Sequence, residues 1–348
     1  MTIIFYSFIF FLSVFFFYAD QYYKKYTNSL VLILFIFLII ISSFRWEVGG
    51  DWGNYYKMSN ETQLFNLFSW SPPLAFSIFI SQKLEIGIFG VNLFITIFLL
   101  YSMYVMLKKL NINVLLVLPM FVSIIYFIVL MGYVRQALAL GFVFLFFAYY
   151  NNKNAIKPII FLFLAISSHI TSIILIPLLF KYLKMSKINL SILFLFSIFL
   201  FYLVYQNYNN IYTSIKIFIL DDIAYHSKGV YYRFLTYILG IVFFFYYKKL
   251  LIKKYPNLIF FFYYSIVIIF ISLVLNVQNI LSTTVDRLNI YNFLFYILCV
   301  SVAYESLKNK NVHYKFIALI YSFHYFLLLG WLIFGNYSIF WLNYKFLN

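Results

Sequence analysis

Long apolar runs recur from one end of this chain to the other, separated by short polar segments. An α-helix needs about 20 apolar residues to cross a hydrocarbon core of about 30 Å. The runs are continuous rather than alternating, which excludes a closed β-barrel. With 65% hydrophobic and 10% charged residues, the 348-residue chain has too little polar surface for a water-soluble globule. We predict an all-α, polytopic transmembrane helical bundle of about 10 to 12 membrane helices.

No boundary between domains is visible, so residues 1–348 are expected to form a single integral membrane domain. Two external loops, about 45–86 and 207–230, are long enough to hold structure of their own. Cys299 is the single cysteine and lies in an apolar run, which excludes an internal disulfide and argues against a zinc site. No Walker-type glycine loop is present, and we predict no cofactor and no metal. Membrane helices are expected near 3–19, 29–44, 87–107, 113–131, 134–150, 156–180, 188–206, 231–248, 257–276, 289–304 and 314–334.

Lysines and arginines occupy different loops. Most lysines lie in clusters such as Lys24–Lys25, Lys108–Lys109 and Lys253–Lys254, which marks those loops as cytoplasmic. The four arginines and most of the acidic residues lie in the remaining loops, which we expect to be external together with the amino terminus. The net charge of +16 then reflects lysines beside anionic lipid rather than a nucleic-acid partner.

One segment does not fit the alternation of successive loops between the two sides of the membrane. If 156–180 crossed the membrane once, the lysine run that follows residue 247 would face outward. The polar residues Ser167, Ser168 and His169 lie at its centre. We predict short re-entrant or broken helices near 156–183 that enter from the cytoplasmic side and turn at His169. The alternative is a single crossing combined with an unrecognised span elsewhere.

The stretch that follows the second apolar run is the most specific one in the chain. It places a base, two acids and three glycines at the outer membrane boundary, and it includes Arg45, Glu47, Asp51, Trp52 and Tyr55. Glycines let the backbone approach a ligand closely. Indole rings suit the interface and also stack on sugar faces. The alternative is an aromatic belt with an arginine anchor.

Other charged residues lie at the ends of later apolar runs. Arg135, followed by Gln136, has no acidic neighbour in sequence, which favours an anionic ligand over a side chain that snorkels to water. His169 is either a proton carrier or phosphate ligand, because its pKa lies near neutrality, or a hydrogen-bonded structural residue. Arg287 has an acidic neighbour, Asp286, that can neutralise it. Arg233 is a weaker candidate.

These motifs resemble the EpsG-type family of bacterial polysaccharide polymerases, relatives of the Wzy O-antigen polymerases. The first motif reads R-x-x-x-G-x-D-W-x-x-Y from Arg45 to Tyr55. Arg135-Gln136-Ala137-Leu138-Ala139 is similar to the R-Q-x-x-A element of the family. The segments 168–172, 286–288 and 341–345 follow in the same order. The chain departs from the family pattern at Pro72, where members often carry a glutamate that is a candidate catalytic acid, and at Asn343, where proline is common.

The resemblance implies a glycosyltransferase that polymerises undecaprenyl-diphosphate-linked oligosaccharides at the outer leaflet of the bacterial cytoplasmic (inner) membrane, with its active site facing the periplasm or exterior. The reaction would release undecaprenyl diphosphate, and a chain-length regulator is a possible partner. The expected diphosphate ligands are Arg45 and Arg135, followed by Arg287, His169 and Arg233. Asp51, Glu47 and His169 are the candidate general bases. Gln136, Trp52 and Tyr55 complete the expected substrate contacts.

Three other classes of protein remain open at this point. An O-antigen ligase also uses lipid-diphosphate donors. A flippase or transporter for lipid-linked sugars would place its cations at several depths of a central cavity. A membrane acyltransferase would need a site for an acyl donor. The gathering of arginines at one membrane face favours chemistry at that face.

Overall fold

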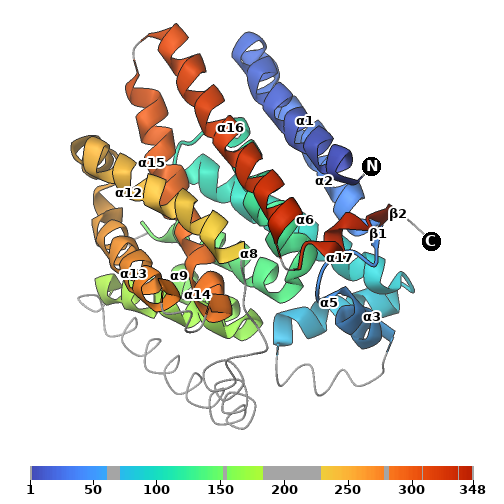
Figure 1. Ribbon diagram of the computed structural model, residues 1–348. Coiled ribbons are helices and arrows are strands. Elements are labelled where there is room, and N and C mark those ends of the chain that lie inside the picture. The colour runs from blue at the N-terminus through green and yellow to red at the C-terminus, as the bar shows by residue number, and fades with distance from the viewer. Residues whose placement is uncertain are drawn as a thin grey trace.

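The computed structural model describes residues 2–60, 71–151, 155–182, 229–277, 282–307, 309–335 and 337–346, and in these residues the chain is a bundle of helices (Figure 1). Seven described helices are long and apolar enough to cross a membrane, and four shorter apolar helices accompany them. The prediction of a polytopic helical membrane protein is confirmed. The expected helix 188–206 and nearly all of the expected loop 207–230 lie outside the described residues.

The longer helices follow the apolar runs of the sequence. They are α1 (Thr2–Tyr22), α2 (Thr27–Ser43), α6 (Gly87–Lys109), α7 (Val114–Phe121), α8 (Val134–Tyr149), α9 (Ile156–Ser168), α12 (Gly229–Lys254), α13 (Ile259–Val277), α15 (Phe293–Ser306) and α16 (Lys310–Phe334).

Short elements connect and extend these helices. They are α3 (Trp52–Asn60), α5 (Pro72–Lys83), α14 (Ser282–Asn289), α17 (Ile339–Leu342), the π-helix η2 (Val122–Leu130), the 3₁₀ helices η1 (Lys24–Tyr26), η3 (Ile170–Tyr182), η5 (Pro256–Leu258) and η6 (Ile290–Asn292), and the strands β1 (Arg45–Trp46) and β2 (Lys345–Phe346).

Two elements differ from the expected ones. The run near 113–131 forms α7 and then widens into η2, a π-helix of the kind that is frequent at functional sites. Residues 282–289 form α14 instead of a loop, and α14 packs against α12 and α13. Its sequence is polar, so no apolar run predicts it. Its stability comes from packing against other helices rather than from a long hydrophobic segment.

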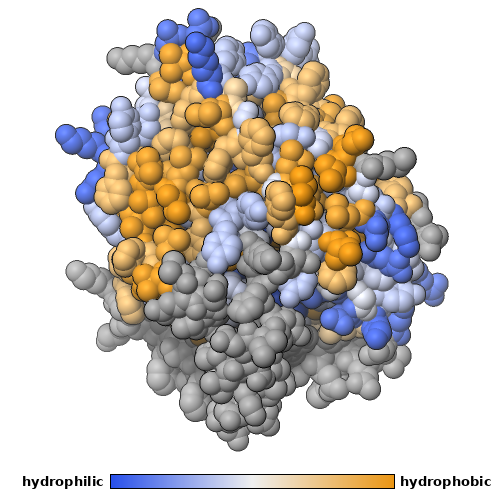
Figure 2. All heavy atoms as spheres, in the orientation of Figure 1, coloured by the Kyte–Doolittle hydropathy of each residue, from blue (hydrophilic) through white to orange (hydrophobic). Residues whose placement is uncertain are grey.

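The bundle has a buried centre and an apolar periphery. Every residue of α7 and η2 is buried, as are nearly all those of α15. The peripheral helices expose large apolar side chains, such as Phe15 at 65%, Phe270 at 66% and Tyr246 at 80%. Apolar side chains cover much of the visible face in Figure 2, with hydrophilic residues gathered toward its edges. Lipid is the solvent that makes such a surface stable.

A buried histidine links three helices inside the bundle. His324 on α16 is fully buried, and its ring nitrogens contact the Ser123 hydroxyl of η2 at 2.8 Å and the Tyr296 hydroxyl of α15 at 2.9 Å. Hydrogen bonds of this kind tie helices together where no water competes. The three helices are therefore held in a fixed register around the centre.

The lysine-bearing loops meet at one end of the bundle. Lys108 Nζ donates to the Asn28 side chain at 3.3 Å, and the Tyr255 hydroxyl donates to the Leu110 carbonyl at 3.2 Å. Lys254 forms an ion pair with Glu305 at 2.6 Å. Loops that are far apart in sequence thus share one end, as the lysine pattern predicts.

Residues 156–182 form a hairpin that begins and ends at this lysine-bearing end. The Tyr150 carbonyl, just before α9, accepts hydrogen bonds from both Lys181 and Tyr182 at the end of η3. The chain breaks at His169, whose backbone is extended with φ −152° and ψ 121°. Ser71, in the first long loop, donates to the Ser168 carbonyl at 3.3 Å. The tip of the hairpin therefore reaches the opposite end, and the predicted break at His169 is confirmed.

The start of α1 and the carboxyl-terminal segment 339–346 lie together at the opposite end (Figure 1). We call it the arginine end, after the four arginines of the chain, Arg45, Arg135, Arg233 and Arg287. Strand β2 pairs antiparallel with β1, matching Arg45 to Phe346 and Trp46 to Lys345. The chain then passes from β1 through residues 47–51 into α3, which packs beside α5 and α6.

Candidate functional site

Two arginines on different helices are fixed beside each other at the arginine end. Arg135 lies in the first turn of α8, and Arg287 lies in α14. The Gln136 side chain donates to the Arg287 carbonyl at 2.7 Å. The Arg287 guanidinium lies 5.4 Å from the centre of the Tyr133 ring, a cation–π arrangement. These contacts join α14 to the start of α8 and hold the two cations near each other.

Asp51 supplies a carboxylate to the same place. It precedes α3 and is half-buried. Burial raises the pKa of Asp51 above its ordinary value, and the positive charges of Arg287 and Arg135 oppose that rise. Tyr55, one turn further along α3, is buried, and burial raises the pKa of its phenol. Arg135 acts against that rise through its charge and through hydrogen bonding. The loop that follows α2 and the start of α8 thus share one charged cluster.

His169 joins this cluster from the hairpin tip. Burial and the charges of Arg287 and Arg135 lower the pKa of His169 well below its ordinary value, so the ring is neutral near pH 7. Its Nδ1 lies 2.7 Å from the Thr171 hydroxyl, and the backbone N–H of Thr171 also points to it at 3.4 Å. Because that N–H can only donate, Nδ1 is an acceptor, and the proton of the neutral ring is on Nε2.

Hydroxyl groups form hydrogen bonds that hold the hairpin tip in place. The Tyr291 hydroxyl contacts the Ser172 hydroxyl at 2.7 Å and the Thr171 hydroxyl at 3.1 Å. Tyr291 lies in η6, directly after α14. The same short segment therefore carries Arg287 and orients the residues that hold His169, so that the histidine is fixed by its neighbours rather than by its own helix.

Asp286 forms its ion pair with Arg233 and not with its neighbour in sequence, Arg287. Its carboxylate accepts from both Nε and Nη2 of Arg233 on α12, in a bidentate ion pair whose side chains are 5% and 3% exposed. The expectation that Asp286 can pair with Arg287 is corrected. Neighbouring residues on a helix point about 100° apart, so Asp286 faces Arg233 on α12 while Arg287 faces the Tyr133 ring.

Breaking the Arg233–Asp286 pair is expected to destabilise the fold. Asp286→Ala leaves a buried, unpaired guanidinium, which costs about 3 to 5 kcal/mol, whereas the double replacement Arg233→Leu with Asp286→Leu recovers most of that loss. The midpoint of thermal unfolding in detergent measures both effects. Glu305→Ala, which breaks the exposed pair with Lys254, is the matched control and shifts stability by less than about 1 kcal/mol. An Asp286→Ala protein as stable as the control would contradict a structural role for the pair.

Arg45 lies apart from this cluster, although the sequence predicts it as a diphosphate ligand. It is 1% exposed, and its guanidinium donates to the carbonyls of Ser42 and Leu130. Burial lowers its pKa to about 10, while the nearby phenols of Tyr344, Tyr126 and Tyr6 act in the opposite direction. We therefore assign Arg45 to the fold: it satisfies the carbonyls that end α2 and η2.

Arg45→Ala is accordingly expected to lower the stability of the protein rather than its chemistry. It removes two buried hydrogen bonds and leaves two carbonyls without donors, at a cost of about 2 to 4 kcal/mol. The amount of folded protein after heating in detergent, followed by size-exclusion chromatography, measures this loss. Full activity per folded molecule is expected. Normal stability combined with lost activity would return Arg45 to the active site.

Glu47 and Trp52 make contacts with other groups. Glu47 forms an exposed ion pair with Lys345 at 2.7 Å and borders a pocket beside the carboxyl terminus. The Trp52 ring is stacked on Tyr56 with centroids 5.0 Å apart and meets Trp46 at 4.8 Å. The tryptophan thus packs in an aromatic group. Of the two acids in the motif, only Asp51 acts on the cluster, because the chain turns between them.

The structure brings together most of the predicted residues from five separate segments. The cluster, which we call the arginine cluster, consists of Asp51, Tyr55, Tyr133, Arg135, Gln136, His169, Arg233, Asp286 and Arg287. Three arginines face two aspartates there, so one positive charge is in excess while His169 is neutral. Sequence reasoning missed Tyr133, Thr171 and Tyr291. Tyr133 lies two residues before Arg135 and Thr171 two residues after His169, and this proximity is the only local signal that could have indicated them.

An excess of guanidinium beside a carboxylate and a neutral imidazole can bind an anion and accept a proton at one place. Arg135 and Arg287 are both half-buried, and a buried nitrogen of Arg233, Nη1, has no hydrogen-bond partner. Charges in such a poorly hydrated place act more strongly than they would in water. The arrangement suits a negatively charged ligand held beside a group that undergoes proton transfer.

The fold and this cluster define a polytopic helical membrane protein with a cluster of charged side chains at one end of the bundle. The chain matches the model of the EpsG family over residues 28–346, nearly its whole length. It therefore belongs to the EpsG family and is a multi-pass membrane protein of polysaccharide biosynthesis. No curated protein and no solved structure matches the chain.

Proposed function

We propose that this protein is a polysaccharide polymerase that joins undecaprenyl-diphosphate-linked oligosaccharide repeat units at the outer leaflet of the bacterial inner membrane. The observation that carries this proposal is the convergence of Arg135, Arg287, Asp51 and His169 at one end of the bundle. Such a reaction needs a site for a diphosphate, a base for a sugar hydroxyl and access from the lipid, and the arginine cluster of a membrane-embedded EpsG member offers the first two directly.

In the proposed reaction, a hydroxyl oxygen of the acceptor sugar attacks the anomeric carbon of the growing chain. The bond between that carbon and the diphosphate oxygen breaks, and undecaprenyl diphosphate leaves with the electron pair. The guanidinium groups of Arg135 and Arg287 bind the diphosphate oxygens and stabilise the charge that develops on them. Lysine could not reproduce the planar, forked contacts that guanidinium makes with phosphate.

Asp51 is the proposed base that accepts the acceptor hydroxyl proton. Burial raises its pKa, which makes its carboxylate a better base than an exposed aspartate. The neutral ring of His169 carries its proton on Nε2, and this suits donation of a hydrogen bond to a phosphate oxygen. The two candidate bases thereby take separate roles, with the histidine as a ligand and the aspartate as the proton acceptor.

A flippase or transporter for the same lipid-linked sugar is the main rival. A flippase would place cations at several depths along a central path. Among the described residues, the arginines of the cluster all lie at the arginine end, whereas the centre of the bundle is filled by the buried residues of α7, η2 and α15. This placement favours chemistry at one face over passage through the bundle.

Reconstitution tests the proposal. Purified protein in vesicles is given lipid-linked repeat units, and the products are resolved by length. A ladder of extended chains with release of undecaprenyl diphosphate is expected. Repeat units that stay single while they move across the bilayer would show a flippase instead, and transfer of preformed chains to a second acceptor lipid would show a ligase.

A further inference from the structure

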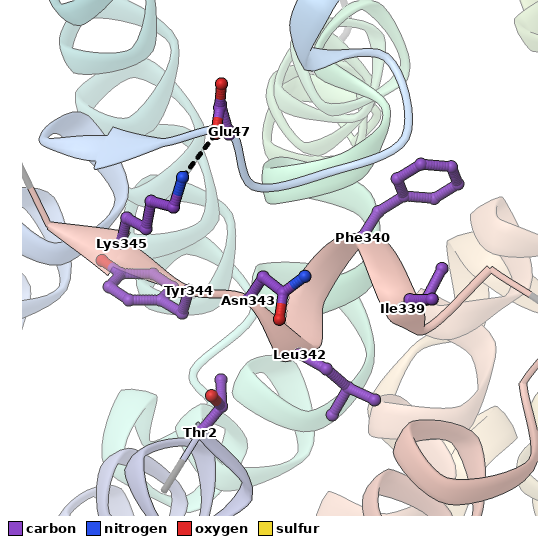
Figure 3. A pocket seen from close by; sticks show the side chains of 8 residues that line it. All are labelled: Thr2, Glu47, Ile339, Phe340, Leu342, Asn343, Tyr344 and Lys345. Atoms are coloured by element: carbon purple, nitrogen blue, oxygen red, sulfur yellow. Dashed lines mark hydrogen bonds and ion pairs between the residues drawn. The ribbon is translucent and has the colours of Figure 1, made fainter. Parts of the chain in front are cut away.

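A pocket opens at the arginine end, outside the arginine cluster. It has a volume of about 550 Å³ and lies between the start of α1, the turn after β1 and the carboxyl-terminal segment. Figure 3 shows its lining, with the Glu47 and Lys345 side chains directed toward each other and the Asn343 side chain projecting from the backbone between Leu342 and Tyr344. A volume of this size is typical of sites for small organic ligands.

The walls of the pocket are held in place by contacts with the bundle. The Trp341 indole donates to the Phe127 carbonyl at 2.7 Å, and the Tyr344 hydroxyl donates to the Ile41 carbonyl at 2.7 Å. The Gly49 N–H donates to the Phe340 carbonyl at 3.1 Å. The carboxyl-terminal segment is therefore anchored to α2 and η2 without the help of the exposed Glu47–Lys345 pair, which contributes little to stability at such exposure.

The backbone at Glu47 is strained in a way that shapes the pocket. Its φ of 53° lies in the left-handed region, which a residue with a side chain seldom adopts. Two residues later, Gly49 has φ 105°, and a Cβ atom there would lie 1.9 Å from the Met131 carbonyl oxygen. The chain is thus forced close to the end of η2, and Glu47 is turned toward the pocket. Strain of this kind is concentrated at ligand sites.

The chemistry of the lining matches a neutral sugar. Glu47 and Lys345 cancel in charge, and both are about half exposed, at 53% and 52%. They and the exposed Asn343 amide offer donors and acceptors to hydroxyl groups. Phe340 is 47% exposed and provides a ring face of the kind that stacks on sugars. A phosphate would prefer the cationic arginine cluster, and an acyl chain would avoid the ion pair.

We infer that this pocket binds a neutral sugar unit of the oligosaccharide whose other end reacts at Asp51, and this inference rests on the proposed function. Glu47 at the pocket and Asp51 in the cluster are four residues apart, so their Cα atoms are separated by at most about 14 Å. One oligosaccharide can therefore contact both places. The pocket sets which repeat unit is accepted, and the arginine cluster performs the transfer.

Binding of a lipid-free oligosaccharide tests the inference. The probe is the repeat-unit oligosaccharide released by hydrolysis from the polysaccharide of the host strain, and saturation-transfer NMR measures its binding to the protein in nanodiscs. Phe340→Ala and Asn343→Ala are each expected to weaken binding by about 10-fold, which corresponds to the loss of one stacking or hydrogen-bonding contact.

Phe346→Ala is the matched control, because Phe346 is equally exposed at 48%, belongs to the same segment and does not line the pocket. It should bind the probe like the wild type. Equal binding by the wild type and both pocket variants would overturn the inference, as would a wild type that does not bind the probe. Thermal unfolding midpoints close to the wild-type value show that the variants are folded.

Chain extension by the same variants separates this inference from the proposed function. The pocket variants are expected to raise KM for lipid-linked repeat units by more than they lower kcat, whereas Arg287→Ala lowers kcat and still binds the free oligosaccharide. If the wild type extends no chains, the proposed function fails while the binding result stands. If the wild type extends chains and the pocket variants bind the probe like the wild type, only the pocket assignment fails.

Discussion

Arg135→Ala and Arg287→Ala are each expected to reduce chain extension by at least about 100-fold, with normal amounts of folded protein. The loss of one group that stabilises developing negative charge in a poorly hydrated site costs about 10² to 10³ in rate. Both side chains are half-buried, and each acts on Asp51 and His169, so they share one site. Product ladders from reconstituted vesicles, normalised to folded protein, measure the effect.

Two further variants sharpen this result. Arg287→Lys keeps the positive charge and loses the forked hydrogen bonds, so it should recover only part of the activity. Lys57→Ala removes an exposed cation from α3, outside the cluster, and should leave the ladder unchanged. Normal ladders from both alanine variants would refute the diphosphate role of the two arginines.

Asp51→Asn is expected to lower the rate of chain extension by about 10² to 10⁴, the range for removal of a general base. The wild-type protein should also lose activity as the pH falls through the pKa of Asp51, because only the ionised carboxylate accepts a proton. Burial raises that pKa above the ordinary aspartate value, so this acid limb lies at a higher pH than an exposed aspartate would give. The asparagine variant should lack the limb.

Coupling between Asp51 and its neighbours gives a sharper test. The charges of Arg287 and Arg135 lower the pKa of Asp51 against the effect of burial. The residual activity of Arg287→Ala should therefore show its acid limb at a higher pH than the wild type does. Rates across a series of buffers of equal ionic strength measure this shift. A limb at the same pH in both proteins would indicate that another group is the base.

Much of the site was visible in the sequence because charged residues are costly in a membrane. Arg135, Asp51 and His169 interrupt or border apolar runs, and each such residue needs a compensating partner or a ligand. The break at His169 followed from lysine positions and from three polar residues in a row. By contrast, α14 was hidden, because a short polar helix carries no hydrophobic run that would reveal it.

The sequence alone did not show which arginine pairs with which aspartate. Sequence proximity suggests Asp286 with Arg287, yet helix geometry turns Asp286 toward Arg233, which lies 53 residues away. Arg45 and Asp51 share one short motif, yet Arg45 is buried against the carbonyls of α2 and η2 while Asp51 acts on the arginine cluster. Two residues of one motif separate because the chain turns sharply at Glu47 and Gly49.

The sequence by itself determined that this protein lies in a lipid bilayer and which of its loops lie at the same end of the bundle. Apolar length decides which segments enter lipid, and lysine placement decides which loops share an end, and both are properties that can be counted along a chain. Only the tertiary structure decided which arginine meets which carboxylate and which acid of the first loop joins the cluster. Those choices depend on the direction of each side chain and on the packing of helices that are distant in sequence.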